Sequence, residues 1–199
     1  MNSNHGLDVS KRKIIHFGSN CKPPYNMFSN FHACDILYKG YTYTSTEHAY
    51  QAQLVDEPHI FAADGPIATL SIESFMYLGY SEKVATQKLK FWKAKQNVGI
   101  LAKLLVKRFS TKNIGKEKCA YLFTEILLVK YSQPMFRNVL LDTADSYLLE
   151  FDKSSERNFR SQNIVRWGGM KVNDKIIGHN QQGVLHMIVR QILSLPLIS

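Results

Sequence analysis

The chain has 199 residues, of which 45% are hydrophobic and 12% aromatic. A chain of this size can bury an adequate core without disulfides or a structural metal. Its three cysteines are widely and irregularly spaced, which argues against a disulfide framework and against a zinc cluster. No apolar run approaches membrane-spanning length, and the first residues show no secretory signal pattern. We therefore expect a cytoplasmic or nuclear protein with no membrane partner.

The net charge of +9 is unevenly distributed along the chain. The segment Lys83–Lys118 contains eleven basic residues and one acidic residue, Glu117, and so carries +10, which leaves the rest of the chain near −1. A solvated helical face is one interpretation of such a segment. The other is a positive surface that attracts phosphate, either from DNA or RNA or from a nucleotide-like ligand.

The N-terminal part of the chain predicts a flexible segment followed by β-structure. Residues 1–10 should be flexible, and residues 11–199 should form a single domain because no linker or repeat interrupts them. The short apolar run 14–17 predicts a strand. The segment 35–44 is rich in β-formers and predicts a hairpin around the turn at Lys39–Gly40.

Helices dominate the middle of the sequence. Thr44 and Glu47 match a capping-box pattern, which predicts a helix that begins at Thr44 and runs to about Val55. The segment Ala63–Pro66 is then expected to interrupt the helical structure. The apolar spacing beyond it predicts further helices at residues 67–76, 82–96, 98–109 and 116–129.

The C-terminal part predicts two strands and a last helix. The strands are expected at 147–151 and 162–167, and Asn180 should cap a helix that ends near Leu193. Apolar residues recur in that helix every four positions, at Val184, Ile188 and Ile192. The fold class expected from these elements is α+β, a mainly α-helical domain around a small β-sheet.

The start of the helix at Thr44 is the first candidate site. A carboxylate at Glu47 would lie near unpaired N–H groups and the positive end of the helix dipole, which favour its ionised form. The structural alternative is a capping residue that reaches back to the N–H of Thr44. His48 and Gln51 beside it supply hydrogen-bonding groups that a purely structural first turn does not need. Two roles for Glu47 therefore stay open at this point, a helix-capping residue or a catalytic carboxylate with His48 and Gln51 as substrate-binding neighbours.

Two small polar loops form the second candidate. Gly18 and Asn20 follow the predicted strand at 14–17, and Phe28, Ser29 and Asn30 follow shortly after. Small polar residues in loops after a strand can line a ligand pocket, although they are also ordinary turn residues.

Glycine-containing segments before the last helix form the third candidate. They are Trp167-Gly168-Gly169 and the stretch that begins with Gly178 and Asn180. Glycines permit close approach of a ligand, and a helix N-terminus can bind phosphate through backbone N–H groups. A plain loop between strand and helix is the structural alternative.

Four stretches, in this order, resemble the NADAR family of YbiA-like N-glycosidases. They are Phe28–Phe31 (FSNF), Thr46–Gln53 (TEHAYQAQ), Trp167–Gly169 (WGG) and Gly178–Arg190 (GHNQQGVLHMIVR). A weaker match covers Val129–Glu150, where KYSQ precedes an apolar helix and the strand LLE. The resemblance implies a compact, mainly helical α+β fold, Glu47 as the catalytic carboxylate, and no metal or organic cofactor.

The chain also departs from the family pattern. The family has an Asp three residues before the Trp of its WG element, where this chain has Ile164. Asp152 is the upstream acid that could replace it as the second catalytic carboxylate. The family's functional Trp corresponds most closely to Trp92, so either Trp92 or Trp167 is expected to stack on the base.

The family cleaves phosphoribosyl–amine bonds in early riboflavin intermediates, or removes ADP-ribose from modified targets that include guanine in DNA. We expect this chain to hydrolyse the C1′–N bond of ADP-ribose attached to a nitrogenous target, because the basic segment Lys83–Lys118 is more than a small free metabolite requires. The alternatives are the riboflavin intermediates and a non-catalytic module that binds ADP-ribose or nucleic acid.

Overall fold

The computed structural model describes residues 7–9, 11–95, 98–109, 112, 114–151 and 166–196. The chain divides into two compact units, one formed by residues 1–29 with 131–199 and the other by residues 30–130. The predicted α+β class with a majority of helix is confirmed. The single-domain organisation stays a prediction. No helix among the described residues is long and apolar enough to cross a membrane.

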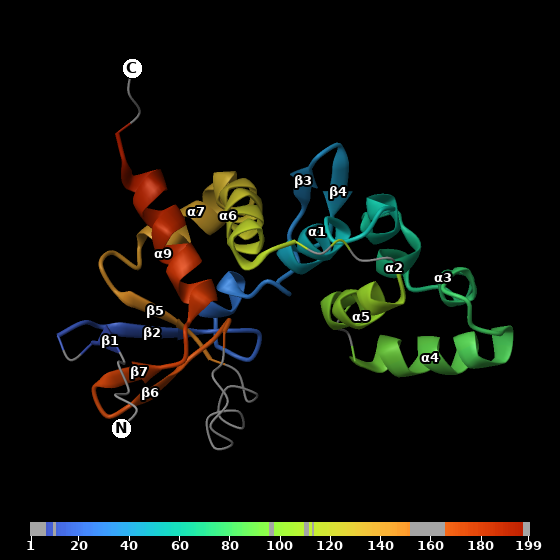
Figure 1. The fold of residues 1–199 in the computed structure, drawn as a ribbon, viewed down its shortest axis with the longest axis horizontal. Coiled ribbons are helices and arrows are strands. Elements are labelled where there is room, and N and C mark those ends of the chain that lie inside the picture. The colour runs from blue at the N-terminus through green and yellow to red at the C-terminus, as the bar shows by residue number, and fades with distance from the viewer. Residues whose placement is uncertain are drawn as a thin grey trace. The chain divides into compact units, whose positions relative to one another are not determined.

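The first unit contains two small sheets (Figure 1). Strand β2 (Ile14–Phe17) pairs in parallel with β5 (Tyr147–Glu150), and both confirm predicted strands. A second, antiparallel sheet has the order β1-β7-β6 and consists of β1 (Leu7–Asp8), β6 (Met170–Val172) and β7 (Lys175–Ile177).

The second sheet differs from the sequence-based expectations. Leu7–Asp8 was expected to be flexible but pairs with β7. The β6–β7 hairpin was missed because its three-residue strands show no clear alternation of polarity. The predicted strand at 162–167 falls mainly outside the described residues, and its last two residues form a bend.

Helix α9 (Gln181–Ser194) packs against β5 and against α7 (Pro134–Leu141). The apolar residues that recur every four positions, Val184, Ile188 and Ile192, lie on the exposed side of this helix. The buried side consists of Gln182, Gly183, Leu185, His186 and Val189. Gly183 sets this orientation, because its missing side chain lets the helix approach the carbonyl oxygen of Leu148 more closely than a Cβ would allow.

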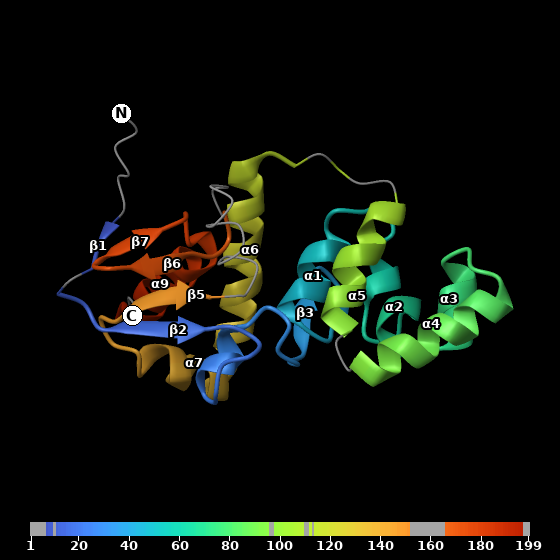
Figure 2. The same cartoon turned by 90° about the horizontal axis from the view of Figure 1, so that it is seen from below.

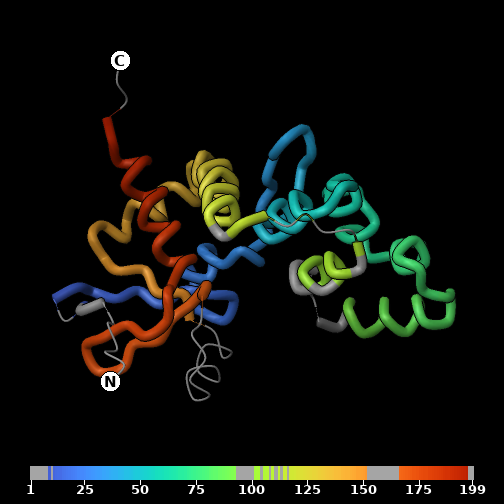
Figure 3. Tube along the Cα trace, viewed as in Figure 1, coloured from blue at the N-terminus to red at the C-terminus, as the bar shows by residue number. Residues whose placement is uncertain are grey.

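The second unit begins with the predicted hairpin, β3 (Ile36–Tyr38) and β4 (Tyr41–Tyr43), which Figure 3 shows as a projecting loop. Lys39 and Gly40 both have positive φ, as the favoured two-residue hairpin turns require. Helix α1 (Thr46–Ala52) follows the hairpin.

The remaining helices largely follow the predicted pattern. They are α2 (Pro66–Thr69), α3 (Ile72–Tyr77), α4 (Glu82–Lys95), α5 (Val98–Leu105) and α6 (Lys116–Ser132), with short 3-10 helices η1 (Tyr25–Phe28), η2 (Pro58–Phe61) and η3 (Val106–Arg108). The predicted helix at 67–76 is two helices, because Leu70 adopts the left-handed conformation and Ser71 caps α3.

Helix α1 is held inside the second unit by neighbours on several sides. It packs against α5 and η2, while α4 packs against α3 (Figure 2). The ring of Tyr50 stacks on Phe123 of α6 with centroids 3.9 Å apart. The hydroxyl of Tyr38 donates to Glu125 of the same helix at 2.8 Å. These contacts bury every residue of α1.

Candidate functional site

The first turn of α1 is organised by Ser45 rather than by Thr44. Ser45 has extended backbone dihedrals and is the N-cap, and its Oγ accepts from the backbone N–H of His48 at 3.3 Å. The predicted capping box is therefore wrong by one residue, which makes Glu47 the second residue of the helix. Its backbone N–H donates to the carbonyl oxygen of Asn30 at 2.9 Å. This bond joins the catalytic candidate to the predicted substrate-binding residue Asn30.

The carboxyl group of Glu47 is almost completely buried, with 5% of the residue exposed. Its Oε1 accepts from Nε2 of Gln51, one helical turn further on, at 2.7 Å. Burial raises the pKa of Glu47, while the charge of Lys103 and the Gln51 hydrogen bond act in the opposite direction. The expectation that the helix start favours the ionised form is thus corrected, because desolvation outweighs the helix-terminal stabilisation. Glu47 is shifted towards its protonated form.

His48 is held as a neutral imidazole in the same turn. Burial lowers its pKa to about 4. Its Nδ1 lies 2.9 Å from Oγ of Ser45 and 3.1 Å from Oγ1 of Thr44. The other ring nitrogen, Nε2, is buried without a hydrogen-bond partner in the described part of the chain.

Unsatisfied buried polar atoms are concentrated in α1. Besides Nε2 of His48, they include Oε1 of Gln51, when partners are sought among the described residues. The side chain of Thr46, by contrast, interacts with the thiol of Cys34. A buried polar atom without a partner costs about 1–3 kcal/mol, so His48 and Gln51 are the candidates in this helix for hydrogen bonds to a ligand.

The loops around residues 18–30 have clear structural roles. Phe28 is fully buried in a cluster with Phe17 and His186, which corrects its expected contact with substrate. Gly18 has φ +153°, and a Cβ there would lie 2.8 Å from the carbonyl oxygen of Phe151. Ser29 is also buried, and its hydroxyl bonds to that of Ser19 at 2.8 Å.

Asn20 is exposed in the turn that follows Gly18. That turn is closed by the backbone bond from Cys21 N–H to the carbonyl oxygen of Gly18. Because Asn20 is exposed and no contact of its side chain decides its role, the expected role in substrate binding stays a prediction.

The segment Trp167-Gly168-Gly169 closes the N-terminus of α9. The carbonyl oxygen of Trp167 accepts from the N–H of Gln182 at 2.9 Å, and that of Gly168 accepts from Asn180 at 3.0 Å. The N–H of Gly169 donates to the carbonyl oxygen of Glu150. These N–H groups already donate to acceptors within the protein. They are therefore not available to bind phosphate at the start of the helix.

Asn180 is fully buried and holds α9 on strand β5. Its Nδ2 donates to the carbonyl oxygen of Leu148 at 2.7 Å and to the hydroxyl of Tyr147 at 3.1 Å, while its Oδ1 accepts from the N–H of Glu150. Asn180 is the N-cap residue of α9, as predicted, but its side chain makes these bonds and no capping bond to the helix. Gly178, with φ +98°, provides the turn that leads to it.

The remaining predicted residues lie elsewhere. Trp92 is a half-buried residue of α4 with an edge-to-face contact to Phe91. Trp167 has the guanidinium of Arg166 4.7 Å above its ring. Asp152 and Ile164 lie outside the described residues. The stacking role of either Trp and the catalytic role of Asp152 stay predictions.

Lys130 is a buried cation that residue-by-residue interpretation of the sequence missed. It lies in α6 and is completely buried, and burial lowers its pKa to about 8. The nearby thiol of Cys34 acts in the opposite direction on Lys130, while burial raises the pKa of Cys34 itself. The KYSQ block marked this position, but only by resemblance.

The basic segment Lys83–Lys118 has an exposed cationic side. Exposed lysines among the described residues are Lys83, Lys90, Lys103, Lys107, Lys112 and Lys118. Lys112 forms an exposed ion pair with Asp56 at 3.6 Å. The described residues contain no group of three or more His, Cys, Asp or Glu side chains that could hold a metal ion.

Comparisons with known proteins identify the fold. No family model and no curated protein matches the sequence. The NMR structure of the Escherichia coli protein YbiA matches with a TM-score of 0.56 and 21% sequence identity, over 97% of this chain and 90% of that one. The chain therefore has a YbiA-like fold.

Proposed function

We propose that this chain is an N-glycosidase of the NADAR family, which hydrolyses the C1′–N bond of ADP-ribose attached to a nitrogenous target such as a nucleobase in DNA. The observation that carries the proposal is the buried polar turn of α1. There a carboxyl group shifted towards its protonated form lies among polar atoms that have no partner in the described part of the chain. The YbiA-like fold supports the proposal at the level of architecture.

Glu47 has the properties of a general acid in this reaction. Cleavage of a ribosyl C1′–N bond builds positive charge on C1′ and the ring oxygen, while the departing nitrogen needs a proton. The burial that raises the pKa of Glu47 favours the protonated carboxyl group, which can supply that proton. The resulting carboxylate then takes a proton from the water whose oxygen bonds to C1′. General acid–base help of this kind contributes roughly 10²–10⁴ in rate.

Gln51 and His48 support this role in different ways. The amide of Gln51 donates to Oε1 of Glu47 and fixes the carboxyl group, which leaves the Oε1 of Gln51 for a ligand hydroxyl. The neutral imidazole of His48 has Nε2 available for a second hydroxyl. Ribose hydroxyls match both groups, since a hydroxyl can donate and accept.

The preference for a nucleic-acid target rests on the basic segment. The segment carries most of the positive charge of the chain, and several of its lysines are exposed. Exposed cations of this kind attract the phosphate backbone of a nucleic acid. A non-catalytic binding module is the second candidate. The observation in its favour is that Ile164 stands where the NADAR family has an Asp.

A turnover assay on the full chain tests the proposal. An oligonucleotide carrying ADP-ribosyl guanine should lose ADP-ribose with the wild-type chain. Glu47→Gln should still bind it but lose at least about a hundredfold in rate. Glu73→Gln, which alters an exposed carboxylate outside the basic segment, is the matched control. Unchanged turnover in Glu47→Gln would overturn the assignment.

The same assay separates the alternatives. Binding of ADP-ribose by the wild-type chain without turnover of any ribosyl substrate would favour the binding module. Faster cleavage of a phosphoribosyl–amine than of the oligonucleotide would favour the riboflavin intermediates.

A further inference from the structure

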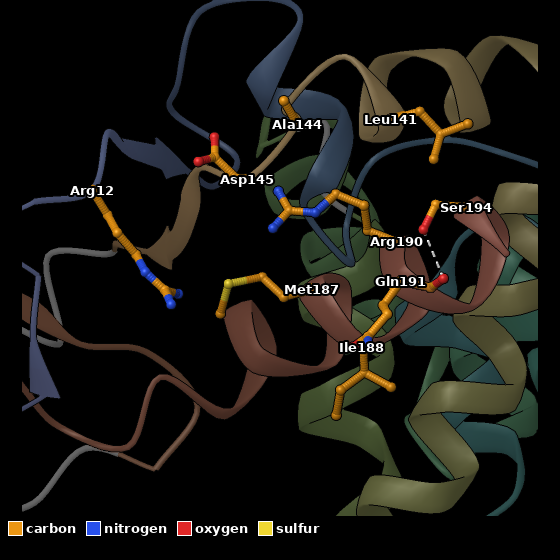
Figure 4. A pocket seen from close by; sticks show the side chains of 9 residues that line it. All are labelled: Arg12, Leu141, Ala144, Asp145, Met187, Ile188, Arg190, Gln191 and Ser194. Atoms are coloured by element: carbon orange, nitrogen blue, oxygen red, sulfur yellow. Dashed lines mark hydrogen bonds between the residues drawn. The ribbon is translucent and has the colours of Figure 1, made fainter.

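A cavity of about 610 Å³ lies in the unit formed by residues 1–29 and 131–199, beside α9 (Figure 4). Its lining comes from the segment before β2, from the end of α7 with the loop that follows it, and from α9. The lining residues are Arg12, Leu141, Ala144, Asp145, Met187, Ile188, Arg190, Gln191 and Ser194. None of them is used by the proposed N-glycosidase reaction. The volume falls within the range of about 300–1,000 Å³ typical of small-molecule sites.

Arg190 enters this cavity as a fixed cation. Its Nη1 donates to Oγ1 of Thr143 at 2.7 Å, and that hydroxyl donates to the carbonyl oxygen of Leu140. One nitrogen of the guanidinium thus anchors the group. Its remaining N–H groups are left for a ligand, because among the described residues Arg190 forms no ion pair with a carboxylate.

A second cation, Arg12, faces the same cavity from a different part of the chain. Figure 4 shows the carboxylate of Asp145 above the space between the two guanidinium groups and the side chain of Met187 below it. Burial lowers the pKa of Arg190, the charge of Asp145 acts against this, and the charge of Arg12 lowers it further. The two arginines therefore repel one another, and one Asp compensates only one of them. An anion placed between them would relieve this repulsion.

Phosphate fits this pair better than carboxylate does. Each guanidinium offers a planar fork of N–H donors, and a carboxylate satisfies one such fork. A phosphate monoester has three terminal oxygens and can accept from two forks that approach from different directions. The lining also includes the apolar side chains of Leu141, Met187 and Ile188, which suit a planar hydrophobic body rather than a free ion.

We propose that this cavity binds a mononucleotide-like phosphate monoester, with its phosphate between Arg12 and Arg190 and its planar base against Met187 and Ile188. The site is separate from Glu47 and its neighbours and does not depend on the N-glycosidase activity.

Methionine-methyl NMR on the full chain tests the proposal. The Met187 methyl signal, assigned with Met187→Leu, is followed while AMP, inorganic phosphate or adenosine is added. AMP should shift the signal at lower concentration than phosphate, and adenosine should leave it unchanged. No shift with AMP at millimolar concentration, or equal shifts with AMP and adenosine, would overturn the proposal. Equal affinities for phosphate and AMP would show that the apolar side chains of the lining contribute nothing to binding, which would also contradict the proposal.

Substitutions that change one charge should alter the affinity for AMP in opposite directions. Arg12→Gln should weaken AMP binding roughly tenfold, the usual worth of one charge-assisted hydrogen bond. Asp145→Asn should strengthen it severalfold, because it removes a negative charge beside the phosphate. Lys11→Gln changes the net charge equally at an exposed neighbour outside the lining and should have no effect. Equal effects of Arg12→Gln and Lys11→Gln would reduce the site to general electrostatics and refute it.

Glu47→Gln should bind AMP at this cavity as the wild type does. A failure of the N-glycosidase assay and a failure of the AMP titration are therefore separate results.

Discussion

His186 on α9 reaches the backbone of Phe28, with its Nε2 3.0 Å from the Phe28 carbonyl oxygen. Its Nδ1 lies 2.8 Å from the carbonyl oxygen of Gln182. A carbonyl oxygen only accepts, so each of these contacts is a hydrogen bond when the ring nitrogen that makes it carries the proton. The rings of Phe17 and Tyr131 pack against the imidazole with centroids 4.9 and 5.6 Å away.

We predict from this arrangement that His186 holds the Phe28 loop against α9. His186→Leu should lower the free energy of unfolding by roughly 1–3 kcal/mol, because it removes the imidazole contact of the buried Phe28 carbonyl oxygen. His179→Leu, at an exposed position, is the control. Equal unfolding free energies of His186→Leu and the wild type in a denaturant titration would contradict the prediction.

His48 should make the protein less stable in mild acid. Its pKa is lowered to about 4 in the folded protein, against 6.5 in the unfolded chain. Between these values the unfolded chain binds more protons, so stability is full above pH 6.5 and falls as the pH drops towards 4. The loss is on the order of 3 kcal/mol. Denaturant unfolding across this range should show the slope in the wild type and in His59→Asn, but a smaller slope in His48→Asn.

Glu47→Gln should stabilise the folded protein while it removes activity. Burial raises the pKa of Glu47, so the folded state resists its ionisation and loses stability as the pH rises above the unfolded pKa. A neutral amide avoids that loss, so the variant should be more stable than the wild type at pH 7. The gain should shrink towards about pH 3, below the ordinary carboxyl pKa, where the group is protonated in both states. Thermal unfolding at the two pH values measures this, and equal Tm values for both proteins at pH 7 would count against the shift.

Gly183→Ala should be strongly destabilising although alanine favours helices. An uncrowded Gly→Ala change inside a helix gains about 1 kcal/mol. Here the new Cβ would overlap the carbonyl oxygen of Leu148 and the side chain of Asn180. The net loss should be roughly 2–3 kcal/mol, as for other overpacked sites. Val184→Ala, the exposed neighbour, should change the unfolding free energy by less than about 0.5 kcal/mol.

Local patterns predicted local structure well. The arms of the hairpin around Lys39–Gly40 and the strand at 14–17 have the predicted bounds, since β-formers and turn residues act over a few positions. Features decided by packing between distant segments were predicted poorly. The apolar residues that recur every four positions in α9 lie on its exposed side. Another face is buried, because Gly183 lets the helix lie close to the carbonyl oxygen of Leu148.

The candidate site shows the same division. Glu47, His48 and Gln51 could be singled out because they are neighbours on one helix. Desolvation of Glu47 could not be predicted, because it depends on α5 and η2 packing over α1. Phe28 was assigned to substrate rather than to the core for a similar reason. Its partner His186 lies more than a hundred residues away, and no local pattern links them.

The parallel pairing of β2 with β5 also constrains how the chain folds. Ile14 lies opposite Tyr147, so this ladder joins segments more than a hundred residues apart. The intervening unit, residues 30–130, is continuous in sequence and contains its own hairpin and helices. Contacts of high sequence separation form late. During synthesis on a ribosome, the α1 turn can therefore form before β5, the strand that pairs with β2, has been synthesised.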